Sequence, residues 1–280
     1  MIYGDMKRKM EIARNKVLNA ISLHGGTTIL STGITGDDAR MAKAAVEAGA
    51  KLLEPNHPAV ALARGHKGVT VMHDAEQIRH EISIYEMAKV TRGIREVVGP
   101  DIYITVGIPG SFTEVVPVEL TEADFKMIAE AGADGLHVHK SDLRDIREIV
   151  EMAHRHGLLI DAYIGLSTDL HPFGVPADTI EELKEVAKEM EKIGVDFIGL
   201  MTGMSYEGIE AGDIPQIIKD RLQALIETVK VPTLAEGGIN TENFKAFINT
   251  GVNILVVGTA FDDIARNAIK NTVKLFLGKK

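Results

Sequence analysis

The sequence contains no cysteine among its 280 residues. Disulfide bridges, thiolate metal sites and cysteine nucleophiles are therefore excluded. An excess of positive charge is also missing, because 31 Lys and Arg residues stand against 40 Asp and Glu residues, for a formal net charge of −9. This balance argues against nucleic acid or an anionic membrane surface as the main partner, while leaving room for a local pocket that binds phosphate.

Long apolar runs are absent as well. No run approaches the roughly 20 apolar residues that a membrane span needs, so we expect a soluble, cytoplasmic protein. The first 23 residues carry Met6, Met10, Ala13, Val17 and Ile21 at helical spacing. This spacing predicts an N-terminal helix that packs across the bottom of the fold.

One short pattern occurs four times, at residues 48–53, 131–136, 193–198 and 250–255. Each copy reads as a helix end, a glycine able to adopt the left-handed conformation, a small residue, a polar residue and a buried strand. Four further apolar strands are expected at residues 27–32, 101–106, 158–163 and 231–235. Eight strands alternating with helices predict an α/β fold, a closed parallel (β/α)8 TIM barrel with an extra N-terminal helix. An open doubly wound sheet is the alternative, and we expect residues 1–280 to form a single domain.

The lengths of the connections indicate which end of the barrel carries the site. The connections from helix to strand are two or three residues long, whereas several connections from strand to helix exceed the usual ~2–6 residues. Long loops on one face of a rigid barrel mark the face that bears the site. The long loops are residues 55–74, 107–120, 165–177 and 202–215. After the first of them, the apolar spacing of residues 75–98 predicts one long helix.

The stretch 231–261 predicts a phosphate site. It contains two apolar strands that each end in glycine before a helix, and glycine lets main-chain N–H groups approach phosphate oxygens. In eight-stranded barrels the loops after strands seven and eight often do this. The alternative is that these glycines are ordinary turn residues. The candidate phosphate ligands are Gly237, Gly238, Gly258 and Thr259, with Thr202 and Gly203 after strand six.

Charged side chains at strand ends are the candidates for chemistry, since such groups have little other reason to lie in apolar strands. We expect Glu236 and Asp161 to act as a general base and acid across the substrate, provided that burial raises one pKa. The alternative is that they only accept hydrogen bonds. The full set of catalytic candidates is Glu54, His139, Lys140, Asp161 and Glu236.

His137 and His139 are two residues apart, so on a strand they point to the same face. We expect a reaction without a cofactor; the alternative is a divalent metal held by His137, His139 and Asp161, or with Glu54 as the carboxylate. One histidine could instead form a hydrogen bond in the barrel mouth while the other lies lower in the core. Lys140 is a candidate for binding phosphate or forming a Schiff base, and its alternative is a solvated strand-end lysine.

Two segments near the C-terminal end resemble a known superfamily. Residues 235–241, Ala-Glu-Gly-Gly-Ile-Asn-Thr, and residues 251–260 resemble the phosphate-binding end of the ribulose-phosphate-binding barrels. They look most like the N-acetylmannosamine-6-phosphate 2-epimerase branch. The resemblance implies that Gly238, Gly258 and Thr259 hold phosphate and that Glu236 lies beside the sugar carbon chain. Residues 104–108 contain no lysine, although the epimerase branch has its acid/base lysine at that strand end.

The sequence as a whole predicts an enzyme that acts on a small phosphorylated metabolite, such as a sugar phosphate. The expected chemistry is proton transfer, as in an isomerase, an epimerase or a related lyase. A metal-dependent barrel enzyme is one alternative. A non-catalytic protein that binds phosphorylated metabolites is another, and the missing lysine favours it. Barrels of this kind often pair through their helices, so a homo-oligomer is a further expectation.

Overall fold

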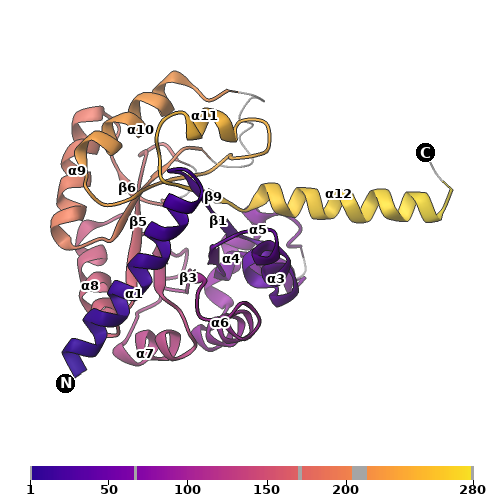
Figure 1. Ribbon diagram of the computed structural model, residues 1–280, viewed down its shortest axis with the longest axis horizontal. Coiled ribbons are helices and arrows are strands. Elements are labelled where there is room, and N and C mark those ends of the chain that lie inside the picture. The colour runs from indigo at the N-terminus through magenta and orange to yellow at the C-terminus, as the bar shows by residue number, and fades with distance from the viewer. Residues whose placement is uncertain (1, 66–67, 170–171, 204–212, 279–280) are drawn as a thin grey trace.

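A closed ring of eight parallel strands forms the centre of the computed structural model, which describes residues 2–65, 68–169, 172–203 and 213–278. Part of the long loop after strand six, residues 204–212, lies outside the described residues. Pairing of β4 with β5 closes the ring, so the predicted (β/α)8 barrel is confirmed (Figure 1). A two-residue strand, β6 (Val175–Pro176), adds to the end of β5. The barrel strands are β1 (Thr28–Thr32), β2 (Leu52–Glu54), β3 (Tyr103–Val106), β4 (Gly135–Val138), β5 (Leu159–Gly165), β7 (Phe197–Met201), β8 (Thr233–Glu236) and β9 (Ile254–Val257).

Helices surround this ring. The glycines of the repeated pattern, Gly49, Gly132, Gly194 and Gly251, have φ angles of 112°, 100°, 104° and 85°, which confirms their left-handed conformation at the helix ends. No helix within the described residues is both long and apolar enough to cross a membrane. The helices are α1 (Ile2–Leu23), α2 (Ile34–Asp37), α3 (Ala39–Glu47), α4 (His57–Ala63), α5 (Met72–Ile78), α6 (Ile84–Val98), α7 (Glu122–Glu130), α8 (Leu143–Arg155), α9 (Ile180–Ile193), α10 (Gln216–Thr228), α11 (Phe244–Ile248) and α12 (Thr259–Phe276), with a 3₁₀ turn η1 (Arg79–Glu81).

The predicted single helix over residues 75–98 is wrong. The structure has α5, then η1, then a separate helix α6 that begins after Ser83. The Ser83 side chain accepts a hydrogen bond from the Glu86 N–H, and the Glu86 carboxylate accepts one from the Ser83 N–H. This reciprocal capping starts a new helix. The apolar spacing runs through the break and conceals it.

The N-terminal helix α1 closes the bottom of the barrel, as predicted. Ala13 and Val17 are buried in one cluster with Leu30 and Leu52, which come from the barrel interior. Lys16 Nζ lies 2.8 Å from Asp134 Oδ1 in the turn before β4. Figure 1 shows α1 lying across the strands at this end. The closed bottom leaves the opposite, carboxyl end of the strands open for a site.

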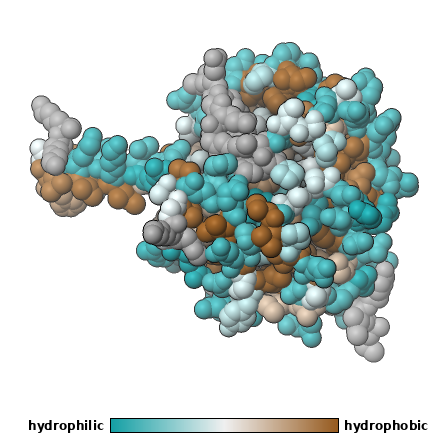
Figure 2. Space-filling view, turned by 180° about the vertical axis from the view of Figure 1, so that it is seen from behind, coloured by the Kyte–Doolittle hydropathy of each residue, from teal (hydrophilic) through white to brown (hydrophobic). Residues whose placement is uncertain are grey.

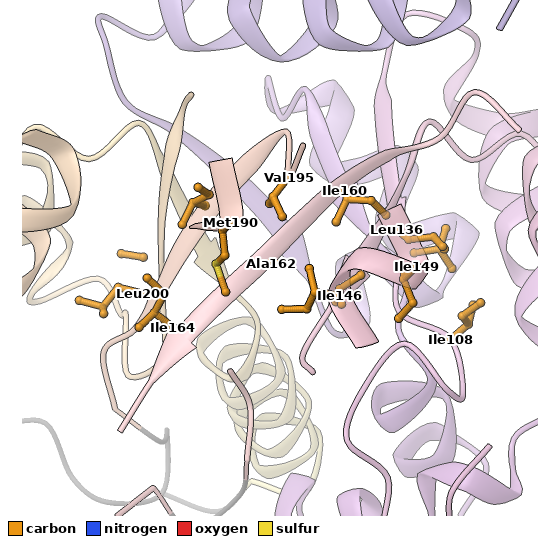
Figure 3. Close-up of a cluster of buried hydrophobic side chains, with 14 of the residues drawn as sticks. Ile108, Leu136, Ile146, Ile149, Ile160, Ala162, Ile164, Met190, Val195 and Leu200 are labelled. Carbon is orange, nitrogen blue, oxygen red and sulfur yellow. The ribbon is translucent and has the colours of Figure 1, made fainter. Parts of the chain in front are cut away.

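Alternation along each strand divides the core into two layers. Ile160, Ala162 and Ile164 of β5 point outward and pack with Ile146 and Ile149 of α8 (Figure 3). The intervening residues of β5 point into the barrel. The same alternation in β4 directs polar side chains into the upper part of the barrel. The layering therefore places a polar cluster above an apolar barrel floor.

Candidate functional site

A pocket of about 200 Å³ opens at the carboxyl ends of the strands, on the face that the long loops predict. Its polar floor is made by His137, His139 and Glu236, and Phe112 and Phe173 form an aromatic wall. The glycine loops complete the opposite rim with Gly203, Gly237, Gly238, Gly258 and Thr259. The structure thus brings the predicted histidines, Glu236 and the predicted glycines into one cavity.

The rim of the pocket depends on the close approach of two loops. A Cβ atom on Gly237, whose φ is 107°, would lie 1.7 Å from the carbonyl oxygen of Gly203. The Thr202 hydroxyl lies 2.9 Å from the Glu236 carbonyl oxygen and 2.8 Å from that of Gly237. Thr202 does not line the pocket, so its hydroxyl ties β7 to β8 instead of facing a phosphate. This corrects the expectation that Thr202 is a phosphate ligand.

The two helices after the glycine loops differ in length. After Gly238 the chain turns before entering the five-residue helix α11, which begins only at Phe244. After Gly258, in contrast, the 18-residue helix α12 begins at once with Thr259. The N-terminus of α12 directs its first N–H groups and the positive end of its dipole toward the pocket rim. At the rim, the N-terminus of one long helix, α12, is therefore available to bind an anion.

The two histidine rings of the floor are held in fixed orientations by hydrogen bonds at their Nδ1 atoms. His137 Nδ1 bonds to the carboxylate of Asp161, and His139 Nδ1 donates to the carbonyl oxygen of Phe173 at 2.6 Å. Both acceptors are oxygens, so each ring carries a proton on Nδ1, and a second proton on one of the rings forms the hydrogen bond between the Nε2 atoms. The two Nε2 atoms therefore face each other, 2.7 Å apart.

Asp161 lies behind His137. Its carboxylate also accepts a hydrogen bond from Thr105 Oγ1 at 2.7 Å, and the Tyr163 hydroxyl lies 3.4 Å away. Asp161 is 1% exposed and does not line the pocket. This corrects the expectation that Asp161 faces Glu236 across the substrate, and it makes Asp161 a residue that positions the His137 ring.

Two glutamates flank the histidines with opposite pKa shifts. Burial raises the pKa of Glu54 to about 8, so this carboxyl group is protonated at neutral pH. Burial alone would also raise the pKa of Glu236, but the charges of His139 and His137 outweigh it and lower the pKa below its usual range. Burial would lower the pKa of His137, yet the charges of Glu54, Asp161 and Glu236 raise it. Environments that separate the pKa values of two carboxyl groups are typical of acid/base sites.

Glu54 itself lies below the pocket. It is completely buried, its Oε1 atom lies 3.7 Å from His137 Nε2, and it accepts a hydrogen bond from Asn56 at 3.0 Å. Glu236 Oε2 lies 3.3 Å from His137 Nε2 and 3.4 Å from His139 Nε2. Within the described parts of the chain, the Oε2 atoms of Glu54 and Glu236 are both buried without a hydrogen-bond partner. Of these two atoms, only that of Glu236 belongs to a residue that lines the pocket.

The ligand set that could hold a metal differs from the expected one. Ligand atoms of His137, His139 and Glu236 all lie within 4.8 Å of one another. Glu236 therefore takes the place that the sequence suggested for Asp161. The reason is that Asp161 bonds the Nδ1 side of the His137 ring, away from the Nε2 atoms.

Lys140 does not join this cluster. Its Nζ atom lies 4.0 Å from Asp145 Oδ2 of α8, and the residue does not line the pocket. Among the described residues that line the pocket there is no Lys or Arg, whereas Glu76, Glu236 and Asp263 are acidic. Positive charge for an anionic ligand must therefore come from histidine, from the start of α12 or from a bound cation.

Several residues of the site were not predicted from the sequence. The ring of Tyr163 stacks on His139, and its position two residues after Asp161 in one strand is a signal that could have revealed it. The buried guanidinium of Arg79 lies 5.4 Å and 5.0 Å from the ring centroids of Phe112 and Phe173. Arg79 also bonds Glu114 at 2.7 Å. These partners come from separate loops, so no spacing pattern could have paired them.

Comparison with known proteins places the chain in a family. The model of the family described as thiamine monophosphate synthase matches residues 120–261, just over half of the chain. The thiamine-phosphate synthase of Ruminiclostridium cellulolyticum is 30% identical over 146 residues, which are 52% of this chain and 59% of that protein. The chain thus spans about three fifths of the length of this curated relative.

Solved structures share the fold at low identity. A 2,3-dimethylmalate lyase matches with a TM-score of 0.62 and 16% identity, covering 94% of this chain and 86% of that one. The N-acetylmannosamine-6-phosphate 2-epimerase of Clostridium perfringens matches with a TM-score of 0.53 and 19% identity, covering 88% and 93%. These likenesses show the barrel fold alone. The match of the family model to residues 120–261 shows that the chain belongs to the thiamine monophosphate synthase family, within the superfamily of barrels that its C-terminal segments resemble.

Proposed function

We propose that this protein is an enzyme that acts on a small phosphorylated metabolite by proton transfer next to a carbonyl group. The observation that carries the proposal is the meeting of Glu236, His137 and His139 with the glycine loops in one pocket. The family match supports a phosphorylated ligand, because the curated relatives are named for thiamine phosphate. An isomerase, an epimerase or a lyase would each begin with this proton transfer.

Glu236 is the proposed base. Its pKa is lowered, so it is ionised at neutral pH, and it faces the cavity. In the proposed step its carboxylate takes a proton from the carbon beside the carbonyl, and the carbonyl oxygen gains negative charge. His137 carries a raised pKa and can donate its Nε2 proton to that oxygen. Return of both protons, one of them to the other face or to the neighbouring carbon, completes an epimerisation or an isomerisation.

The glycine rim is the proposed phosphate end. Main-chain N–H groups of Gly237, Gly238 and Gly258 lie at the rim together with the start of α12 at Thr259. A phosphate held there would fix the position of the carbon chain over Glu236. Binding energy from this remote group then contributes to the rate of the proton transfer.

A second candidate is the reaction for which the curated relatives are named, the formation of thiamine phosphate. Membership of the family favours it. The acidic floor and the histidine pair do not by themselves distinguish it from the first candidate. Both candidates require a phosphorylated compound in this pocket.

A thermal-shift screen tests the proposal. The wild-type protein is heated with a panel of sugar phosphates, thiamine and thiamine phosphate, and inorganic phosphate serves as the control. We expect stabilisation by one or a few phosphorylated compounds, and stabilisation by thiamine phosphate would favour the second candidate. Thr259→Asp places a negative charge at the rim and should remove the effect, whereas Thr241→Asp, on an exposed turn, should retain it. Absence of any stabilisation would contradict both candidates.

A further inference from the structure

We propose that His137, His139 and Glu236 form a site for one divalent transition-metal ion at the floor of the pocket. The inference rests on the pocket of the proposed function, yet it requires only the three ligand atoms and no substrate. Ligand atoms of these residues lie within 4.8 Å of one another. The site is built from His137 of β4, from His139 just after that strand and from Glu236 at the end of β8.

The distances suit a small ion. A tetrahedral ion with bonds of about 2.0–2.1 Å holds its ligand atoms roughly 3.3 Å apart. Glu236 Oε2 lies 3.3 Å from His137 Nε2 and 3.4 Å from His139 Nε2. The two Nε2 atoms are 2.7 Å apart, so the rings would separate by roughly 0.6 Å to reach the tetrahedral spacing.

The hydrogen bonds on the far side of each ring prepare both Nε2 atoms as ligands. His137 Nδ1 is held by Asp161, and His139 Nδ1 donates to the Phe173 carbonyl oxygen at 2.6 Å. The two Nε2 atoms then face each other 2.7 Å apart and need a positive charge between them, which a proton on one ring supplies in the metal-free site and a metal ion supplies when it is bound. A histidine oriented by a carboxylate or a carbonyl is the common arrangement around a protein-bound metal.

The donor set indicates the class of ion. Two imidazole nitrogens and one carboxylate oxygen favour Zn²⁺, Mn²⁺, Fe²⁺ or Co²⁺ over Mg²⁺ and Ca²⁺, which prefer oxygen ligands. Three protein ligands leave a coordination position open toward the cavity, as in catalytic zinc sites. A bound ion would supply the positive charge that no Lys or Arg provides among the described lining residues. It would polarise a carbonyl or phosphoryl oxygen.

Isothermal titration calorimetry tests this site. Protein made without a histidine tag is freed of metal by chelation and titrated with Zn²⁺, Mn²⁺ or Mg²⁺. We expect one Zn²⁺ or Mn²⁺ per chain and at most weak binding of Mg²⁺. Glu236→Gln and His139→Gln should each weaken binding about 100-fold, and Asp161→Asn about 10-fold or more. His156→Gln, which removes a histidine at the surface, is the matched control and should bind like the wild type.

Circular dichroism and melting temperature establish that each variant folds. The partly exposed Glu236 is the variant least expected to disturb folding. Absence of 1:1 binding in the wild type, or equal affinity in wild type and Glu236→Gln, would overturn the metal site. Because no substrate is present, this outcome is distinct from failure of the proposed function. Turnover by metal-free protein would leave that function standing without the ion.

An independent observation concerns the last helix. Figure 1 shows α12 projecting from the barrel, and none of its 18 residues is buried. Ile269 is 66% exposed and Phe276 is 89% exposed. In Figure 2 apolar side chains gather along one edge of the projecting helix and polar ones along the other. An amphipathic helix of this kind has an apolar face that normally packs against another surface.

An apolar surface that could receive this face lies beside the N-terminal end of α12. An apolar hollow of about 290 Å³ is lined by Ile29 of β1, Leu255 and Val257 of β9, and Ile248 of α11. In a (β/α)8 barrel the helix after the last strand covers this part of the wall. Here α12 runs outward after its first turns, so the outward-facing side chains of β1 and β9 keep an open hollow.

We infer that α12 of one copy packs into the hollow of a second copy, with the reverse contact formed at the same time. In a dimer related by a two-fold axis, both exposed apolar surfaces of each chain, the face of α12 and the hollow, would be covered. The part of α12 that projects beyond the hollow of its own chain, residues 265–276, is about 18 Å long and about 10 Å wide, so two such segments on two barrels would bury roughly 700 Å² in total. That area is typical of a small, weak interface, so we expect a weak dimer.

The absence of cysteine makes a cross-linking test direct. Ile269→Cys on α12 is combined with Ile248→Cys at the hollow, and the protein is oxidised. We expect a disulfide-linked dimer on a non-reducing gel. Asn267→Cys lies on the polar side of α12, so its combination with Ile248→Cys should give at least 10-fold less dimer. Equal cross-linking by the two pairs would overturn the docking.

Light scattering after gel filtration provides the second measurement. At the high micromolar concentrations that a weak interface requires, we expect the wild type to be dimeric, Ile269→Glu to be monomeric, and Asn267→Glu to be dimeric like the wild type. A monomeric wild type would overturn the inference. A dimer that persists in Ile269→Glu would overturn it too, because another surface would then form the interface.

Discussion

The ring of Tyr163 stacks on the imidazole of His139, with centroids 4.5 Å apart and ring planes inclined by 18°. The facing position of the neighbouring strand is Gly199, where a Cβ atom would lie 2.2 Å from the Tyr163 ring. The absence of a side chain at Gly199 therefore makes room for the tyrosine. The tyrosine in turn supports a histidine of the pocket floor.

We expect the ring of Tyr163 to matter more than its hydroxyl. The hydroxyl lies 3.4 Å from Asp161, a long hydrogen bond, so Tyr163→Phe should lower the free energy of unfolding by less than about 1 kcal/mol. Tyr163→Ala removes a completely buried ring and should cost about 3–5 kcal/mol. Urea unfolding measures both values. A larger loss for Tyr163→Phe than for Tyr163→Ala would contradict the stacking role.

Gly237 and Gly251 form a matched pair for testing the pocket rim. Both have left-handed backbone, with φ of 107° and 85°, but only at Gly237 would a Cβ atom collide with Gly203. Gly251→Ala should cost about 1–2 kcal/mol, from backbone strain alone. Gly237→Ala should cost more and should also abolish ligand stabilisation, because the β7 and β8 loops must separate. Equal losses of unfolding free energy in urea would contradict the close approach.

Acid should unfold the protein partly through Glu114. Burial alone would raise the pKa of Glu114, but His57 and Arg79 outweigh it and lower the pKa from 4.5 to about 2. A lowered pKa in the folded state stabilises the protein above pH 4.5, and this stability is lost as the pH falls toward 2. The shift corresponds to about 3 kcal/mol. Glu114→Gln should therefore be less stable at pH 7 and show a shallower loss below pH 4.5.

Urea unfolding between pH 2 and 7 measures the acid effect. Glu130→Gln, at an exposed carboxylate on the surface, serves as the control and should follow the wild-type pH profile closely. A Glu114→Gln profile parallel to that of the wild type would show that Glu114 is not responsible.

Glu54 should change the pH dependence of the free energy of unfolding in the opposite direction. Its pKa is raised by burial from 4.5 to about 8, so the folded protein must retain a proton that the unfolded chain loses. The free energy of unfolding therefore falls as the pH rises from 4.5 to 8. Glu54→Gln removes this loss, so its stability relative to the wild type should increase across that interval. Melting temperatures at pH 5 and pH 8 provide the check, and a constant difference between them would contradict the raised pKa.

Much of the barrel follows from short-range patterns. The glycines of the four repeats mark helix ends because only glycine adopts their backbone conformation at low cost. The alternation that begins in β4 and continues to His139 just after it places His137 and His139 on the inner face, as their spacing predicts. The break between α5 and α6 is the exception, since the capping signal of Ser83 and Glu86 is weaker than the apolar spacing around it.

The hydrogen bonds and ion pairs of the site could not be predicted in the same way. The sequence identifies Asp161 as a buried carboxylate, but not which nitrogen of His137 it bonds. That choice depends on side-chain rotation and on the neighbouring hydroxyl of Thr105. Arg79 and Glu114 meet across 35 residues, from a turn and a loop, so no local pattern pairs them.

Hydrogen exchange in D₂O tests the central claim most directly. A compound that stabilises the protein is incubated in D₂O with wild type or with Glu236→Gln, and its C–H signals are followed by NMR. Proton transfer to Glu236 predicts that the wild type replaces one hydrogen beside the carbonyl with deuterium. Glu236→Gln should bind the compound with nearly unchanged affinity and exchange this hydrogen at least 100-fold more slowly. A compound that binds in the pocket and retains all its hydrogens with the wild type would contradict the proposed chemistry.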